Sequence, residues 1–173
     1  MKKHNGMRPH DIVILLKIAA KNNQSWLMKD LSYELSISAS EVSESINRSV
    51  IAGLISFNKK NLMKLNLLDF LNHGLSYVYP EQPGALVRGV ATAHSAAPLN
   101  KIIISEEPYV WPSGNGSVRG QAITPLHPKV PEAALKDQNF YELMSLVDTL
   151  RVGRAREKEI ARKELRKKIL DGE

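Results

Sequence analysis

Arginine and histidine recur in the same order in two stretches of the chain. Residues 77–80 and 109–112 both read Tyr-Val-aromatic-Pro, and each is followed by a Val-Arg-Gly triplet, at 87–89 and 118–120, and then by a histidine. Guanidinium and imidazolium groups bind phosphates and carboxylates. Two related hairpins arranged about a pseudo-twofold axis would bring together an anion or ligand pocket made of Arg88, His94, Arg119 and His127.

A purely structural interpretation of the repeat is also open, because repeats readily arise for packing reasons. Each arginine would then pair with one of the nearby carboxylates of Glu81, Glu106 and Glu107, and the glycines would only relieve crowding. Under either interpretation the proline- and glycine-rich region 67–130 is expected to be rich in β structure. Hairpin turns are predicted at Pro83-Gly84 and Asn115-Gly116, and a buried strand is predicted at 102–104.

No arrangement in the sequence indicates catalysis or a metal site. The five histidines never stand three or four residues apart, and the absence of cysteine excludes thiolate ligands, thiol nucleophiles and disulfides. No nucleophile elbow or ordered triad is present, and the Gly-Asn-Gly sequence at 114–116 lacks the lysine of a phosphate-binding loop. We therefore expect no enzymatic activity, no cofactor and no metal.

Charge is distributed unevenly over the 173 residues. Basic residues outnumber acidic ones in 1–66 and in 151–173, whereas acidic residues are in excess in 67–150. A basic surface favours a polyanionic partner, although it can equally be a solvated face. Lys2 and Lys3 are not followed by the apolar run of a secretory signal, and no stretch is apolar enough to span a bilayer. We expect a soluble, cytoplasmic protein that does not associate with membranes.

Three helices and a hairpin are predicted in the N-terminal region 1–66. Apolar periodicity and helix-end signals place the helices at about 8–20, 26–36 and 39–52. The first helix is apolar on more than one side, which predicts burial on two sides, partly against a partner subunit. Ser38 and Glu41 form a capping-box pattern at the start of the third helix. Residues 54–66 comprise two short extended runs around a basic turn, as in a hairpin.

This order of elements resembles the winged helix-turn-helix regulators of the MarR type. The resemblance depends on residues 31–43, with leucines four residues apart before an Ile-Ser turn, and on the Ala-Gly-Leu-Ile sequence at 52–55. Ser36 stands where the family usually has glycine. The resemblance covers about residues 8–66. It implies a DNA-binding domain whose third helix enters the major groove and whose hairpin, the wing, touches the backbone or the minor groove.

The resemblance implies DNA contacts at particular residues. Base-reading side chains near the start of the third helix would be Ser40, Ser43, Glu44 and Asn47, because their polar groups suit base edges. Phosphate contacts would come from Arg48, Lys29, Lys59, Lys60 and Lys64. Winged helices also serve as protein-docking modules, and Glu41 and Glu44 place negative charge on the face that would meet DNA.

The C-terminal region 131–173 is predicted to be helical. A short turn at 131–135 precedes an amphipathic helix with an apolar stripe from Phe140 to Leu150, and a basic helix follows at about 151–170, with Gly153 marking a hinge. The resemblance leads us to expect a homodimer formed through terminal helices. The basic tail would lie along DNA or be simply solvated. A membrane-surface helix fits less well because the apolar face is narrow.

The sequence as a whole predicts an α+β protein with three regions. These are an N-terminal winged helix-turn-helix (1–66), a β-rich middle region with a duplicated hairpin (67–130) and C-terminal helices with a basic tail (131–173). We expect a dimeric, sequence-specific transcriptional repressor that binds double-stranded DNA. The alternative is an antitoxin-like or adaptor module that binds a partner protein through the middle region and the 140–150 stripe.

Overall fold

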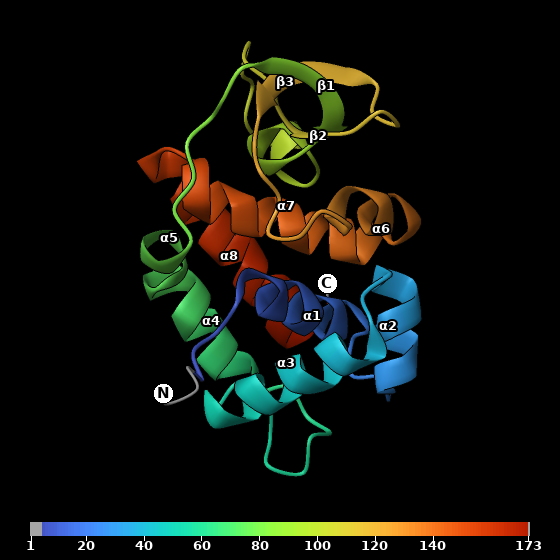
Figure 1. Cartoon of the computed structure of the whole chain (residues 1–173). Helices are drawn as coiled ribbons and strands as arrows, with labels where there is room; N and C mark the ends of the chain where they lie inside the picture. Colours follow the sequence, from blue (N-terminus) through green and yellow to red (C-terminus); the bar gives the residue numbers. More distant parts are fainter. Residues whose placement is uncertain (1–4, 173) are drawn as a thin grey trace.

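The computed structural model describes residues 5–172. Lys2 and Lys3, on which the expectation about a secretory signal depends, lie outside the described residues. The fold is α+β: helices make up most of the described chain, and three strands form a small barrel (Figure 1). The elements in chain order are α1 (Pro9–Ala20), α2 (Met28–Leu35), α3 (Ala39–Ile51), α4 (Lys64–His73), α5 (Leu75–Val78), β1 (Leu86–Ala91), η1 (Ala93–Ser95), η2 (Leu99–Lys101), β2 (Tyr109–Pro112), β3 (Val118–Ala122), α6 (Val130–Lys136), α7 (Gln138–Val152) and α8 (Ala155–Asp171).

Helix α1 is the central element of the fold. Every residue from Asp11 to Ala20 is buried, and α2, α3 and α7 all pack against the helix. Figure 1 shows α1 between α7 on one side and α3 on the other. A helix that is apolar around its circumference must be covered around its circumference. Here that cover comes from this chain itself, so the burial of α1 requires no partner subunit.

The helices of the N-terminal region begin and end within two residues of the predicted positions. Leu31, Leu35, Val42 and Ile46 are buried on the facing sides of α2 and α3, as their spacing predicts. The hairpin after α3 is smaller than expected. A single antiparallel bridge joins Ile55 to Leu62, and neither flank is long enough to form a strand.

The three strands close into a barrel whose pairing differs from the predicted hairpins. Strand β1 is antiparallel to both β2 and β3, and β2 and β3 run parallel to each other. Glycine makes this tight closure possible. A Cβ atom on Gly89 would lie 2.0 Å from the carbonyl oxygen of Trp111, and one on Gly120 would lie 2.5 Å from that of Pro108. The fully buried Trp111 fills the space between the barrel and α7.

Two predictions for the middle region were wrong. The first copy of the repeat begins in helix α5 rather than in a strand, and the parallel pairing of β2 with β3 means that the second copy is not a hairpin either. Residues 102–104 do not form a buried strand, and Ile104 is 98% exposed. The closed barrel offers no free edge to a further strand, and the Ile103 N–H instead donates to the Leu99 carbonyl in a helical turn.

The C-terminal helices complete the hydrophobic core. The stripe from Phe140 to Leu150 on α7 is buried, and Ala161, Leu165 and Ile169 of α8 pack into the core on the side of α4 and α7. One apolar cluster runs from Ile12 to Ile169 and includes residues of all three predicted regions. Gly153 separates α7 from α8 as expected. None of the helices in the described part of the chain has the length and apolar content needed to cross a bilayer.

Candidate nucleic-acid interface

The connection between α2 and α3 is a tight turn with a left-handed residue at its centre. Ser36 has φ 54° and ψ 40°, a conformation that favours glycine. It stands at the position where the MarR-type regulators that the sequence resembles usually have glycine. The next residue, Ile37, is buried and anchors the turn in the core. Ser38 then caps α3 by accepting a hydrogen bond from the Glu41 N–H, and its hydroxyl donates to the Glu41 carboxylate at 3.0 Å. The N-cap role predicted for Ser38 is confirmed.

Helix α3 presents a polar face to solvent between residues 39 and 47. Its candidate base-reading residues are exposed at Ser40, Glu44 and Asn47 and half-buried at Ser43. The hydrogen bond from Ser38 is the main reason that the pKa of the exposed Glu41 lies below its ordinary value. Glu41 and Glu44 both place carboxylates on this face, and Glu44 lies 3.8 Å from Arg48. Attraction to DNA phosphates must come from other elements.

A short loop supplies exposed cations next to α3. Residues 56–61 project from the end of the molecule that carries α3 (Figure 1). The Ser56 N–H donates to the Asn61 carbonyl at 2.8 Å, and the Ser56 hydroxyl donates to the Asn58 side chain at 2.6 Å. These bonds hold the loop closed, while Lys59, Lys60 and the 94% exposed Phe57 point into solvent.

The other two lysine candidates lie on neighbouring helices. Lys29 is exposed on α2, and Lys64 is half-buried as the first residue of α4. Lys60 and Lys64 line the same small groove, of about 130 Å³, with Trp26 and Asn61. The structure therefore brings at least two of the four lysines together.

The prediction that Arg48 contacts phosphate was wrong. Its side chain is buried, with Nε and Nη2 each donating to an oxygen of Asp11 at 2.8 Å, and Nη2 lies 3.2 Å from His10 Nε2. Burial acts to raise the pKa of Asp11, but the hydrogen bonds from Arg48 and from the Arg8 N–H outweigh it and keep that pKa below its ordinary value. Arg48 is thus committed to fixing α3 on α1 and does not lie with the exposed candidates.

The four residues of the predicted anion pocket do not gather at one place. Arg88 and Arg119 stand directly opposite each other on β1 and β3, and both are exposed. His94 is instead buried, with Nε2 3.0 Å from the Glu107 carbonyl oxygen and its ring against Tyr109. His127 lies beside His10 near the start of α1, where burial and the neighbouring His10 lower its pKa. Only the arginines form a candidate site.

A buried polar network escaped the sequence analysis. The Asp148 carboxylate on α7 accepts hydrogen bonds from Thr92 at 2.8 Å, Trp111 at 2.6 Å and Arg151 at 3.0 Å. Its complete burial raises its pKa, and Arg151 opposes that effect. Arg151 also donates to the Tyr79 and Thr124 carbonyls. The network ties the barrel to α7, and its one signal in the sequence is an aspartate within an apolar helical stripe.

A polar cleft of about 940 Å³ lies between the α1–α2 pair and the α6–α7 pair. The nearly buried Lys17 contributes its ammonium group, which lies 2.5 Å from Asp137 and 3.1 Å from Glu34. Lys21 also contacts Glu34, at 2.9 Å. These charges compensate one another, and the ion pairs fix α2 relative to the start of α7.

Two surfaces that the sequence assigned to partner proteins are packed against other elements of the same chain. The 140–150 stripe, through which a partner protein would bind in the alternative interpretation, is part of the core. The terminal helices expected to form a homodimer are likewise packed within the chain at α1, α7 and the apolar face of α8.

Comparison with protein-family models, curated proteins and solved structures finds no match for this chain. Within residues 5–172, the histidines and carboxylates form no group of three that could hold a metal ion.

Proposed function

We propose that this chain is a DNA-binding transcriptional regulator that uses α2, α3 and the 56–61 loop as a winged helix-turn-helix. The observation that carries the proposal is the arrangement of α3. Its start is set by a left-handed turn at Ser36 and a serine cap at Ser38, and its exposed side bears Ser40, Glu44 and Asn47. A rigidly held helix with a polar, uncovered N-terminal half is what major-groove readout requires.

The proposal divides the work between two sets of side chains. Asn47 would contact adenine through its amide, and the serines would contact either base of a pair. Lys59 and Lys60 on the loop, with Lys29 and Lys64, would neutralise phosphates. Because Glu41 and Glu44 repel phosphates, binding would depend strongly on these lysines.

The partner-binding alternative loses one of its two surfaces, because the 140–150 stripe is buried in the core. The uncovered polar face of α3 therefore favours DNA as the partner. A mobility-shift titration with the DNA upstream of the chain's own gene, against scrambled DNA at two salt concentrations, tests the proposal. We expect the preference for upstream DNA to persist at the higher salt, while overall affinity falls by about 0.9 log units per log unit of salt for each neutralised phosphate.

Matched variants make this titration specific to the proposed face. The Lys59→Gln/Lys60→Gln variant should weaken binding to both DNAs and reduce the salt slope by about two. Lys101→Gln removes an exposed lysine at the end of η2 and should leave binding to both DNAs unchanged. Sequence-independent binding that responds equally to all of these variants would contradict the proposal.

A further inference from the structure

The duplicated Val-Arg-Gly triplets meet face to face in the barrel. Arg88 on β1 pairs in register with Arg119 on β3, and the flanking pairs are Val87 with Gly120 and Gly89 with Val118. An antiparallel pairing of two identical triplets centred on arginine has local twofold symmetry. Side chains directly opposite in such a pair lie on one face of the sheet with their Cβ atoms about 5 Å apart. The register therefore brings the two guanidinium groups to the same exposed face.

No carboxylate compensates these two charges in the described chain. Glu81, one of the expected ion-pair partners, accepts from the Thr124 N–H and lies 3.9 Å from Arg151 instead. Neither Arg88 nor Arg119 forms an ion pair within residues 5–172, and the Arg119 side chain has no hydrogen-bond partner there. Like charges directly opposite on paired strands destabilise a sheet. Within the described residues, therefore, neither arginine forms the ion pair that the structural interpretation of the repeat expects.

The backbone beneath the pair is closely constrained. A Cβ atom on Gly116 would lie 2.0 Å from the Gly89 carbonyl, so the turn before β3 is pressed against β1. Arg88 Nε donates to the Gly116 carbonyl at 2.8 Å, which holds the guanidinium in place and leaves its terminal nitrogens unbonded within the described chain. A ligand would therefore meet donors that are already positioned on a rigid support, and little ordering entropy would be lost on binding.

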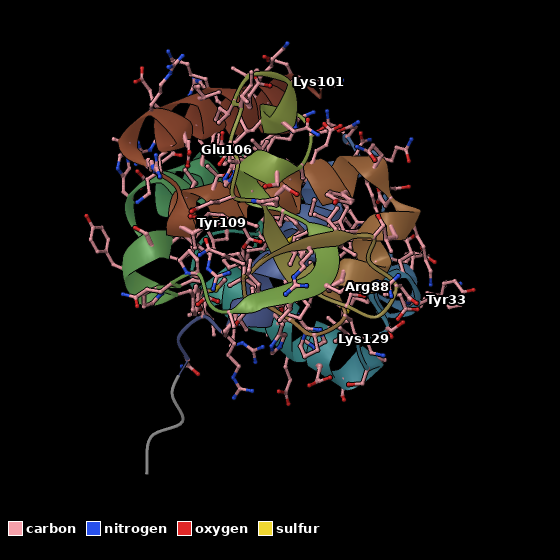
Figure 2. All side chains as sticks on the ribbon, turned by 90° about the horizontal axis from the view of Figure 1, so that it is seen from above. Tyr33, Arg88, Lys101, Glu106, Tyr109 and Lys129 are labelled. Atoms are coloured by element: carbon pink, nitrogen blue, oxygen red, sulfur yellow. The ribbon has the colours of Figure 1, made fainter. Side chains whose placement is uncertain are left out.

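We propose that Arg88 and Arg119 together form a binding site for a phosphate group. Two guanidinium forks supply two positive charges and several N–H donors, which match a doubly charged phosphate with several acceptor oxygens better than a single carboxylate. Figure 2, which looks down on the barrel, shows Arg88 on the face of β1 nearest the viewer. The barrel lies at the opposite end of the molecule from the 56–61 loop (Figure 1), so this site is separate from the proposed DNA-reading face.

The phosphate can belong to a small phosphorylated molecule or to a polynucleotide, and two probes distinguish these sources. The experiment follows the arginine Nε–Hε NMR signals of the full chain during titration with inorganic pyrophosphate and, separately, with a short single-stranded oligonucleotide. We expect the Arg88 and Arg119 signals to move together and to saturate with at least one probe. Saturation with pyrophosphate indicates a small ligand, and saturation with the oligonucleotide alone indicates a polynucleotide.

Three variants provide the controls. Arg88→Gln/Arg119→Gln should weaken binding of the effective probe by about tenfold or more, because it removes charge-assisted hydrogen bonds from both forks. Arg88→Lys/Arg119→Lys keeps the charge but not the fork and should also weaken binding. Arg162→Gln removes an exposed arginine of α8 and should not. The proposal is overturned if neither probe gives saturable shifts, or if the Arg162 variant loses as much affinity as the double glutamine variant.

Discussion

Arg48 and Asp11 join α3 to α1 through two hydrogen bonds of 2.8 Å each, between side chains that are 7% and 0% exposed. The Arg48 Nε and Nη2 atoms donate to the two oxygens of one carboxylate, the strongest geometry available to such a pair. The pair sets the orientation of α3 on the core. It therefore also sets the direction in which the exposed face of α3 points.

Replacing Arg48 should destabilise the fold strongly. Arg48→Ala would leave the buried Asp11 carboxylate without its main partner, and the expected loss is about 3–5 kcal/mol of unfolding free energy. Urea denaturation measures this loss. The exposed Arg162 provides the matched control, since Arg162→Ala should change stability by no more than about 0.5 kcal/mol. Equal effects of the two substitutions would contradict the structural role of Arg48.

The same pair predicts a loss of stability in acid. The pKa of Asp11 in the folded chain lies below its ordinary value of 3.8, so the unfolded chain binds the proton more readily. The contribution of the pair to stability is therefore complete above pH 3.8 and declines as the pH falls through the lower folded pKa. Urea midpoints measured across this range should fall more steeply for the wild type than for Asp11→Asn, and parallel curves would argue against the depressed pKa.

Replacing the buried Asp148 should destabilise the fold about as much as replacing Arg48. Asp148→Ala would leave the Trp111 indole N–H, the Thr92 hydroxyl and one bond of Arg151 unsatisfied in the core, and we expect a loss of about 3–5 kcal/mol. The near-ultraviolet circular dichroism of Trp111 should change as well. The exposed acid Glu159 on α8 supplies the control substitution, Glu159→Ala. A variant with wild-type stability would show that the network contributes little.

Replacing Arg119 should stabilise the fold, in contrast to the substitutions of Arg48 and Asp148. Since it stands opposite Arg88 without an ion-pair partner in the described chain, Arg119→Gln should raise the free energy of unfolding by about 0.2–1 kcal/mol in the absence of ligand. Added salt should shrink the difference by screening the repulsion. Thermal unfolding at low and high salt measures both effects. A destabilised variant would mean that Arg119 has a stabilising contact and that the pair is not under repulsion.

Asn47 should affect recognition without affecting stability. It is exposed on α3, so Asn47→Ala should leave the unfolding free energy within about 0.5 kcal/mol of the wild type. If its amide reads adenine, the variant should lose about 1–3 kcal/mol of discrimination at one base pair. Binding to a set of single-base variants of the upstream DNA measures this. Equal losses on every DNA would contradict the assigned role.

The helices could be predicted from the sequence because their signals are local. Leucine spacing indicates the buried side of α2, and the Ser38–Glu41 pattern marks the start of α3 within the same turn of chain. Ser36 shows the limit of such reasoning at a single position. Regulators of the MarR type, which the sequence resembles, usually have glycine at this position, and the Ser36 backbone adopts the left-handed conformation that glycine would favour.

The barrel and the buried ion pair depend on contacts between distant residues and could not be predicted. Gly89 and Gly120 permit close approach of backbones that are not neighbours in the chain, so their role becomes visible only once the strands meet. Arg48 is similar: nothing near it in the sequence shows that Asp11 lies beside it. Only the opposition of Arg88 and Arg119 was suggested in advance, because a repeated motif can imply local symmetry.

The most direct test of the central proposal is to map where duplex DNA contacts the chain. Amide NMR shifts of the full-length protein should be followed during titration with the DNA upstream of its gene. We predict that the largest shifts fall in residues 39–47 of α3 and in the 56–61 loop. Shifts confined to the barrel around Arg88 and Arg119, or no saturable shifts in α3 and the loop, would contradict the proposal that α3 reads DNA.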